Sequence, residues 1–303
     1  MNLFKTSLMA FAALMLITTG CQKDTKLGSQ DNPVKLYFTP SVDSDTITSN
    51  SKDFIQFLEK ETGLFFKTGI PTNYVAVVEA FGSKRADIGV MNSFGYLMAN
   101  SKYGAEAKLR VIRYGHDYYQ GQIIAHVDSG IKTVKDLQGK RFGFTDPSST
   151  SGYMFPLKIL KDNEVEPGKT TFLTKHDNVV TSIYQKQVDA GATYYSAPSK
   201  DGKIRDARSR VKTQFPDVED KVKIIAITEK IPNDPFVFRK DLPTEVTTKF
   251  IAAVKKYLST EKGKTTFKNI YSVDGLVDTS DADYNGLRDM IKSINLDLDS
   301  VIK

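Results

Sequence analysis

The sequence contains a single cysteine, Cys21, among its 303 residues. One thiol cannot form an intrachain disulfide, and the three histidines, His116, His126 and His176, are scattered without the spacing typical of a metal site. The sequence also lacks a P-loop and a glycine-rich dinucleotide-binding signature. We therefore expect neither a metal ion nor an organic cofactor.

Runs of one charge sign are also absent. The 42 Lys and Arg residues exceed the 36 Asp and Glu residues by a net charge of +6, but the two signs are interleaved along the chain. Proteins that bind nucleic acids usually concentrate basic residues in runs or alternate them with aromatic residues. We expect no nucleic-acid partner, and a mildly basic surface would instead steer small anions toward the protein.

Hydrophobic runs long enough to cross a membrane are missing as well. The apolar run at residues 8–17 is shorter than the ~20 residues of a membrane-spanning helix, and it follows Lys5 as in a signal sequence. Residues 18–21, Thr-Thr-Gly-Cys, resemble a bacterial lipobox, although Thr18 replaces the usual leucine. We expect residues 1–20 to be a lipoprotein signal peptide and Cys21 to carry the lipid that anchors the exported protein in the cell envelope. An ordinary signal peptide and an uncleaved anchor are the alternatives.

The rest of the chain has a globular composition, with 40% hydrophobic and 26% charged residues. Residues 21–32 are polar and are interpreted as a flexible tether. Strand-like segments, such as residues 34–38 and 86–90, then alternate with amphipathic helical segments, such as residues 51–62 and 73–82. This alternation predicts an α/β fold with parallel strands, and the length suggests about two domains.

A hydroxyl-rich segment at residues 145–153, Thr-Asp-Pro-Ser-Ser-Thr-Ser-Gly-Tyr, separates a predicted strand from a predicted helix. The N-terminus of a helix has unpaired N–H groups and the positive end of the helix dipole, so it favours anions. Ser149, Thr150 and Ser151 add hydroxyl donors, and Gly152 allows close approach of the backbone. No Lys or Arg lies in the segment, which therefore predicts an oxyanion site made of neutral donors. The alternative is an ordinary helix N-cap.

Together and in order, four segments resemble the phosphate-, phosphite- and phosphonate-binding proteins of bacterial ABC importers. These segments are residues 72–80, 146–153, 188–193 and 231–235. The resemblance implies a type II periplasmic-binding-protein fold, in which two α/β lobes are joined by two crossover strands and the ligand lies in the cleft between them. We place lobe 1 at residues 33–118 plus 229–303 and lobe 2 at residues 119–228.

The resemblance also implies which residues contact the ligand. The predicted contacts are Tyr74, Ser149, Thr150, Ser151, His176 and Asp234. The three hydroxyl residues would hold phosphoryl-type oxygens, and Asp234 would accept a proton that phosphate-like anions can donate and sulfate cannot. From the residue types alone, Tyr74 and His176 could equally be core residues, and Asp234 a turn residue.

Two positions depart from the family members that bind aminoalkylphosphonates. Met91 lies where those members have a tyrosine, and Ser196 lies where they have a carboxylate that faces the ligand tail. The part of the site that holds the anion is therefore expected to be intact and the part that holds the tail to be changed. We expect Asn92, Tyr194 and Tyr195 to line the changed part.

The predicted function is the substrate-binding component of an ABC importer. It would deliver a small phosphorus oxyanion to permease and ATPase subunits, and we expect it to act as a monomer. One alternative is a lipid-anchored sensor input. Another is a phosphoesterase with Ser149 or Ser151 as nucleophile and His176 as base, but no G-x-S-x-G motif surrounds either serine.

Overall fold

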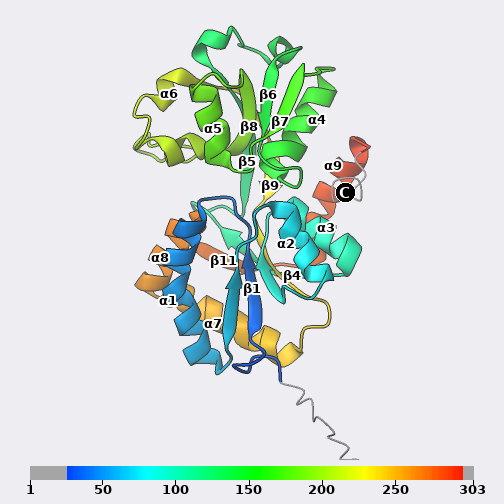
Figure 1. The fold of residues 1–303 in the computed structure, drawn as a ribbon, viewed down its shortest axis with the longest axis vertical. Coiled ribbons are helices and arrows are strands. Elements are labelled where there is room, and N and C mark those ends of the chain that lie inside the picture. The colour runs from blue at the N-terminus through cyan, green and yellow to red at the C-terminus, as the bar shows by residue number, and fades with distance from the viewer. Residues whose placement is uncertain (1–25, 296–303) are drawn as a thin grey trace, which may run out of the picture.

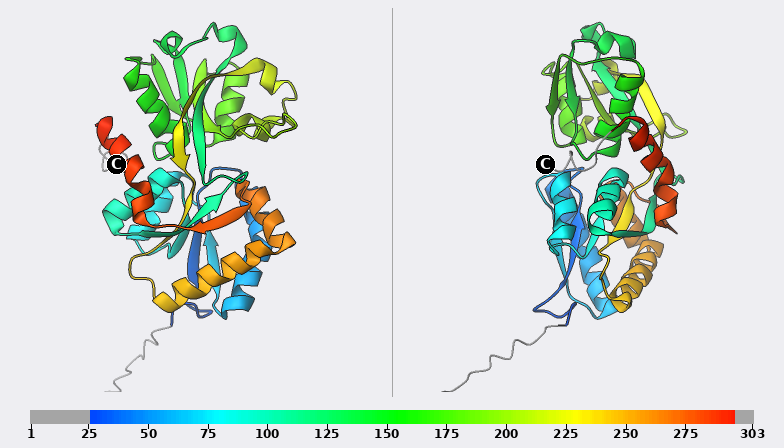
Figure 2. Two further views of the ribbon diagram at one scale, coloured as in Figure 1. Left: turned by 180° about the vertical axis from the view of Figure 1, so that it is seen from behind. Right: turned by 90° about the vertical axis from the view of Figure 1, so that its right-hand side faces the viewer.

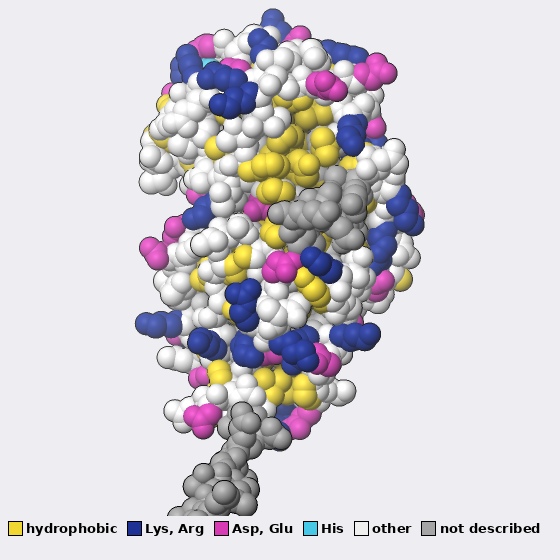
Figure 3. All heavy atoms as spheres, turned by 45° about the vertical axis from the view of Figure 1, so that its right-hand side comes forward, with side chains coloured by type: hydrophobic (Ala, Val, Ile, Leu, Met, Phe, Trp, Pro, Cys, Tyr) yellow, Lys and Arg dark blue, Asp and Glu magenta, His cyan; other side chains and the backbone are white. Residues whose placement is uncertain are grey.

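The computed structural model describes residues 26–295, which form two lobes stacked along the long axis of the molecule (Figure 1). The predicted signal peptide and the predicted lipidation site Cys21 lie outside the described residues. No helix within the described range is long and apolar enough to cross a membrane. On the face drawn in Figure 3, acidic and basic side chains are interspersed over both lobes.

The first lobe is built on a mixed sheet with the strand order β11-β4-β10-β3-β1-β2. These strands are β1 (Val34–Phe38), β2 (Phe66–Gly69), β3 (Ile88–Val90), β4 (Glu106–Ile112), β10 (Pro235–Phe238) and β11 (Gly275–Asp278). β1 is parallel to β2 and β3, whereas β10 is antiparallel to β3 and β4. The lobe therefore contains segments from both ends of the chain.

Helices cover both faces of this sheet. The core on one face joins the sheet to α1 (Ser44–Thr62), α7 (Thr244–Ser259) and α8 (Glu261–Tyr271), and the core on the other joins it to α2 (Tyr74–Gly82), α3 (Ser93–Tyr103) and α9 (Asn285–Ser293). α1 begins before the predicted position because the Asp43 side chain caps it, accepting from the N–H groups of Asp45 and Thr46.

The second lobe has a sheet with the strand order β7-β6-β8-β5-β9. Its strands are β5 (Tyr118–His126), β6 (Arg141–Phe144), β7 (Lys169–Phe172), β8 (Ala190–Tyr195) and β9 (Val222–Pro232). Its helices include α4 (Phe155–Asp162), α5 (His176–Tyr184) and α6 (Val218–Lys221). The chain enters this lobe along β5 and returns along β9, which pair antiparallel from Tyr118–Pro232 to His126–Val222. This arrangement confirms the predicted two-lobed α/β fold with two crossover strands.

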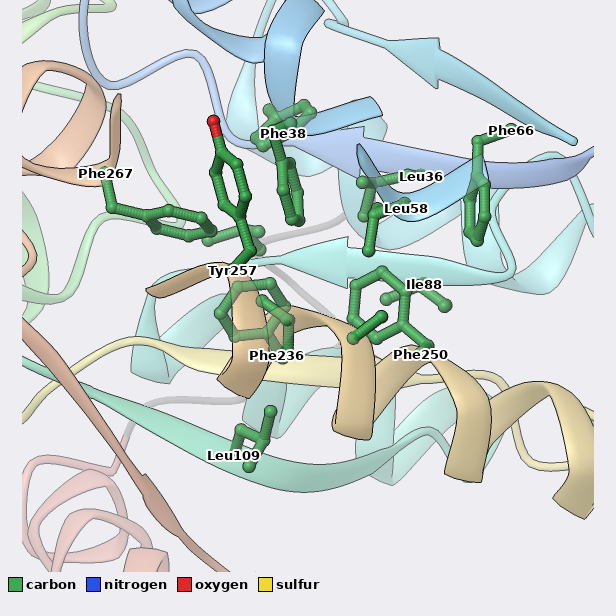
Figure 4. Close-up of a cluster of buried hydrophobic side chains, with 14 of the residues drawn as sticks. Leu36, Phe38, Leu58, Phe66, Ile88, Leu109, Phe236, Phe250, Tyr257 and Phe267 are labelled. Atoms are coloured by element: carbon green, nitrogen blue, oxygen red, sulfur yellow. The ribbon is translucent and has the colours of Figure 1, made fainter. Parts of the chain in front are cut away.

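A large aromatic core fixes the strands of the first lobe that end at the cleft. Figure 4 shows Phe38 of β1 and Ile88 of β3 facing Phe236, Phe250 and Tyr257, which come from the C-terminal part of the chain. Fully burying each such side chain contributes about 1.5–3 kcal/mol to folding. The residues that follow β1 and β3 are therefore held on a rigid base at the cleft.

A second apolar cluster crosses from one lobe to the other. Met154 and Phe155 of the second lobe pack with Val77 of α2 and with Leu287 and Ile291 of α9. The rear and side views in Figure 2 show α9 running along the boundary between the lobes. The two lobes are thus in contact away from the crossover strands.

The last part of the predicted flexible tether is folded. Residues 26–32 form hydrogen-bonded turns, and the Gly28 carbonyl accepts from the Phe65 N–H at 2.8 Å. Leu27 packs against the core of the first lobe. This part of the tether prediction is wrong because it rested on polar composition, and one apolar side chain with backbone hydrogen bonds is enough to hold the segment.

Candidate functional site

The hydroxyl-rich segment lies at the carboxyl end of β6, at the boundary between the lobes. Ser149 caps a short helical turn at Thr150–Met154, and its hydroxyl accepts from the Gly152 N–H at 3.1 Å. Gly152 is required here because a Cβ atom would lie 2.2 Å from Thr145 Oγ1. The prediction of a helix N-terminus at this position is confirmed.

A pocket between the lobes contains most of the predicted site residues. The lining residues from the first lobe include Thr39, Tyr74, Met91, Asn92, Arg113, Tyr114, Asp234 and Tyr271. The lining residues from the second lobe include Ser149, Ser151, His176, Tyr194, Ser196, Arg205 and Arg210. Chain segments more than 150 residues apart in the sequence are thus brought to one pocket.

Thr150 is not among the lining residues, and its hydroxyl is already used. It donates to Asn92 Oδ1 at 3.0 Å and accepts from the Phe94 N–H at 2.9 Å. Because a hydroxyl has one proton, Thr150 cannot also donate to a ligand in this conformation. The Thr150 hydroxyl thus connects the lobes, and a ligand contact at Thr150 stays a prediction that this arrangement does not support.

Tyr74 and Asp234 each present a buried polar atom without a hydrogen-bond partner among the described residues. These atoms are Tyr74 Oη and Asp234 Oδ1. Burial, followed by the negative charges of Asp146 and Asp234, raises the pKa of Tyr74, so its hydroxyl keeps its proton. Buried polar groups are almost always hydrogen-bonded, and an unpaired one costs roughly 1–3 kcal/mol. A bound ligand could supply both missing partners.

The other oxygen of Asp234 is paired with Arg113, which sequence reasoning missed. Arg113 Nη2 donates to Asp234 Oδ2 at 2.6 Å, and Arg113 Nε donates to the Tyr271 carbonyl at 2.7 Å. The side chains of Arg113 and Asp234 are only 12% and 19% exposed, so this ion pair is weakly screened. Asp234 is therefore less repulsive to an anion than an isolated carboxylate would be.

His176 is a neutral acceptor toward the pocket. The Thr145 hydroxyl donates to the Ala192 carbonyl at 3.1 Å, and it also lies 3.3 Å from His176 Nδ1. With the hydroxyl proton directed to Ala192, Nδ1 carries the imidazole proton and Nε2 is left as an acceptor. Burial, with smaller effects from Arg210 and Arg113, lowers the pKa of His176 to about 3.

Two further arginines line the pocket, so the expectation of neutral donors alone is wrong. The Arg205 guanidinium carbon lies 4.4 Å from the centre of the Tyr114 ring, and Arg210 Nε donates to Tyr194 Oη at 3.3 Å. Both arginines come from a segment far in sequence from the hydroxyl loop. No motif marks that segment, so local sequence patterns could not have found it.

The residues predicted to line the changed part of the site are only partly brought together. Asn92 and Tyr194 line the pocket, as do Met91 and Ser196. Tyr195 does not line it and instead lies in an adjoining surface hollow. The prediction for Tyr195 is wrong because neighbouring residues of a strand point to opposite faces of the sheet.

The sequence matches a known protein family and is similar to two curated proteins. A family described as "ABC transporter, phosphonate, periplasmic substrate-binding protein" matches residues 36–284. The phosphonates-binding periplasmic protein of Escherichia coli K12 is 24% identical over 225 residues, which are 72% of this chain and 64% of that protein. The phosphate-import protein PhnD of Mycolicibacterium smegmatis is 25% identical over 204 residues, covering 61% of this chain and 64% of that protein. The matches thus span somewhat less than two thirds of each curated relative.

A solved structure supports the same fold. The structure of PhnD1 from Prochlorococcus marinus in complex with methylphosphonate superposes with a TM-score of 0.74. Its sequence is 17% identical, and the match covers 86% of this chain and 98% of that chain.

Proposed function

This chain belongs to the family of periplasmic substrate-binding proteins of phosphonate ABC transporters, and from that premise we propose that it is the substrate-binding component of a bacterial ABC importer. It binds a small phosphorus oxyanion, namely phosphate, phosphite or a phosphonate, in the cleft and delivers it to a permease and its ATPase. One observation carries the proposal. The unpartnered Tyr74 Oη and Asp234 Oδ1 share a pocket with Ser149 and Ser151, on the opposite lobe.

The pocket offers both donors and acceptors to such a ligand. The Ser149 hydroxyl already accepts from Gly152, so its own proton is available for an anionic oxygen. The Tyr74 hydroxyl can donate in the same way from the other lobe. Asp234 Oδ1 can only accept, which requires a ligand that retains a proton. A phosphate or phosphonate near neutral pH has a P–O–H group, whereas sulfate is fully ionised, so Asp234 favours phosphorus anions.

Native mass spectrometry tests the proposal directly. Adding phosphate, phosphite or methylphosphonate should give a one-to-one complex, and a variant with Tyr74→Phe and Ser151→Ala should lose most of it. The absence of a complex with all three anions would overturn the proposal.

The burial of His176 argues against the hydrolase alternative. Its Nε2 faces the pocket as an acceptor, but an imidazole whose pKa is lowered to about 3 is a poor general base at neutral pH. We therefore propose binding without catalysis. A chromogenic phosphate monoester should remain unhydrolysed, and turnover would contradict this part of the proposal.

Lipid anchoring at Cys21 remains part of the proposed function. It is supported by the order of Lys5, the apolar run at residues 8–17 and the Gly20–Cys21 pair in the sequence. Cys21→Ser should release the protein from membranes. A variant that stays membrane-bound as tightly as the parent would show that Cys21 is not the anchor.

A further inference from the structure

The pocket has more positive than negative charge on its lining. Arg113, Arg205 and Arg210 contribute three guanidinium groups, Asp234 contributes one carboxylate, and His176 is neutral. Arg113 is paired with Asp234. Arg205 and Arg210 form no ion pair with any residue in the described part of the chain. Two cationic groups of the pocket therefore lack a protein counter-ion.

The nearby carboxylates do not form ion pairs with these arginines. Asp206 follows Arg205 in the sequence, but its two oxygens accept from Arg208 Nε at 3.0 Å and Nη2 at 2.9 Å. Asp177 attracts Arg210 but forms no ion pair with it.

Neutral aromatic residues hold these arginines instead. Tyr114 and Gly115 form a tight turn with φ values of 53° and 77°, closed by hydrogen bonds of 2.9 and 3.0 Å between Arg113 and His116. A left-handed conformation costs a tyrosine roughly 1–2 kcal/mol, and two successive positive φ values are typical of a tight hairpin turn. This turn places the Tyr114 ring against Arg205. Because Tyr114 and Tyr194 are neutral, most guanidinium N–H groups of Arg205 and Arg210 are left for a ligand.

We propose that the ligand of this site is a phosphorus oxyanion with a second anionic group, a carboxylate or a phosphoryl group, on a short tail. The inference rests on the proposed function, and it assigns the second anion to Arg205 and Arg210. A guanidinium group matches a carboxylate or phosphoryl group with two parallel hydrogen bonds. An amine at the same end of the ligand would meet two cations and be repelled.

Calorimetry with ligands that differ only in their tails tests the proposal. At neutral pH, 3-phosphonopropionate or methylenediphosphonate should bind at least tenfold more tightly than methylphosphonate, and 2-aminoethylphosphonate should bind at least tenfold more weakly than 3-phosphonopropionate. Comparing the two dianionic ligands shows which second anion the site prefers. Arg205→Gln and Arg210→Gln should each remove most of the gain from the second anion, because each should weaken 3-phosphonopropionate binding by a larger factor than methylphosphonate binding.

Lys203→Gln is the matched control. Lys203 lies in the same segment, is 83% exposed at its side chain, pairs with Asp201 and does not line the pocket. Lys203→Gln removes one positive charge, as each arginine variant does, and it should leave all affinities within twofold. If methylphosphonate binds but neither dianionic ligand binds more tightly, or if the amine-bearing ligand binds most tightly, the proposal is wrong and the proposed function stands. If no phosphorus anion binds, both fail.

Discussion

At the scale of single residues, the pocket contains two buried polar atoms that have no hydrogen-bond partner in the described part of the chain. Tyr74 Oη and Asp234 Oδ1 have none among residues 26–295, whereas the buried Tyr257 hydroxyl lies 3.0 Å from Thr266 Oγ1. Such atoms lower the stability of the ligand-free protein and raise the affinity for a ligand that supplies the missing bonds. Removing one of these polar atoms by mutation should therefore weaken ligand binding and leave the stability of the ligand-free protein unchanged or higher.

Tyr74→Phe should separate these two effects. Losing a hydrogen bond to an anion costs about 1.5–3 kcal/mol, so Kd should rise by roughly one to two decades. Stability without ligand should stay unchanged or increase, because the removed hydroxyl has no partner. Tyr257→Phe is the matched control, since it should lose about 1 kcal/mol of stability and retain binding. Calorimetry and denaturant unfolding measure both quantities, and a stability loss in Tyr74→Phe equal to that in Tyr257→Phe would contradict this account.

His176 should make the protein less stable in mild acid. Its pKa is lowered to about 3 in the folded state, while an unfolded histidine titrates near ~6.5. Between these values the unfolded state binds one proton more, so the free energy of unfolding falls as pH decreases, by up to about 1.4 kcal/mol per pH unit. Denaturant unfolding between pH 6.5 and pH 3.5 should show a shallower decline for His176→Gln than for the parent. Parallel curves would mean that His176 is not buried in its neutral form.

At the scale of elements, the junction between β6 and α4 contains both the hydroxyls that we propose bind the ligand and an interlobe contact. Local sequence predicted the junction well, because one segment contains all the signals of a strand followed by a helix N-terminus. These signals are a short strand pattern, a run of Ser and Thr, and a glycine. It could not predict the Thr150 contacts, because Asn92 and Phe94 lie 58 and 56 residues away. Alternation along β8 could have separated Tyr194 from Tyr195 before the structure was known.

Gly152→Ala should disrupt this junction. The added Cβ would lie 2.2 Å from Thr145 Oγ1 and 2.9 Å from Ser149 Oγ, so the loop must move. We expect Kd for phosphorus anions to increase at least tenfold and stability to fall by about 1–3 kcal/mol. Gly286→Ala in α9 is the control, because nothing lies within 4 Å of the added atom and alanine favours helices. If the two variants behave alike in melting and binding assays, Gly152 has no special role.

At the scale of the whole molecule, several contacts hold the two lobes together around the pocket. Besides the Thr150 contacts, the Tyr74 N–H donates to Asp146 Oδ2 at 3.3 Å, and Lys175 lies 3.8 Å from Asp43. The alternating strands and helices predicted the α/β class, because each pattern is local, whereas the two lobes joined by crossover strands were implied by the family resemblance. The arginines of the pocket were not predictable, since they meet only after both lobes have folded and approached each other.

Ligand binding should therefore compact the molecule. An anion touches both Tyr74 and Ser151 only when the lobes are closed, so small-angle scattering should show a smaller radius of gyration with saturating ligand. Thr150→Val should favour the open form, because it removes the hydrogen bond to Asn92 Oδ1 and leaves the Phe94 N–H without its partner. The variant should bind more weakly in proportion to its smaller closed population. Thr265→Val, at an exposed position of α8, should match the parent. An unchanged radius at demonstrated saturation would rule out closure.

The most direct measurement is calorimetric titration of phosphate, phosphite, methylphosphonate and sulfate into protein that has been refolded to remove bound ligand. At least one phosphorus anion should bind at least tenfold more tightly than sulfate, because we propose that Asp234 Oδ1 accepts the proton that only these anions retain. Asp234→Asn should narrow the difference, because its amide can donate to a fully ionised oxygen. Equal binding of sulfate and the phosphorus anions by the parent, or no binding of any of them, would contradict the assignment of this cleft as a phosphorus-oxyanion site.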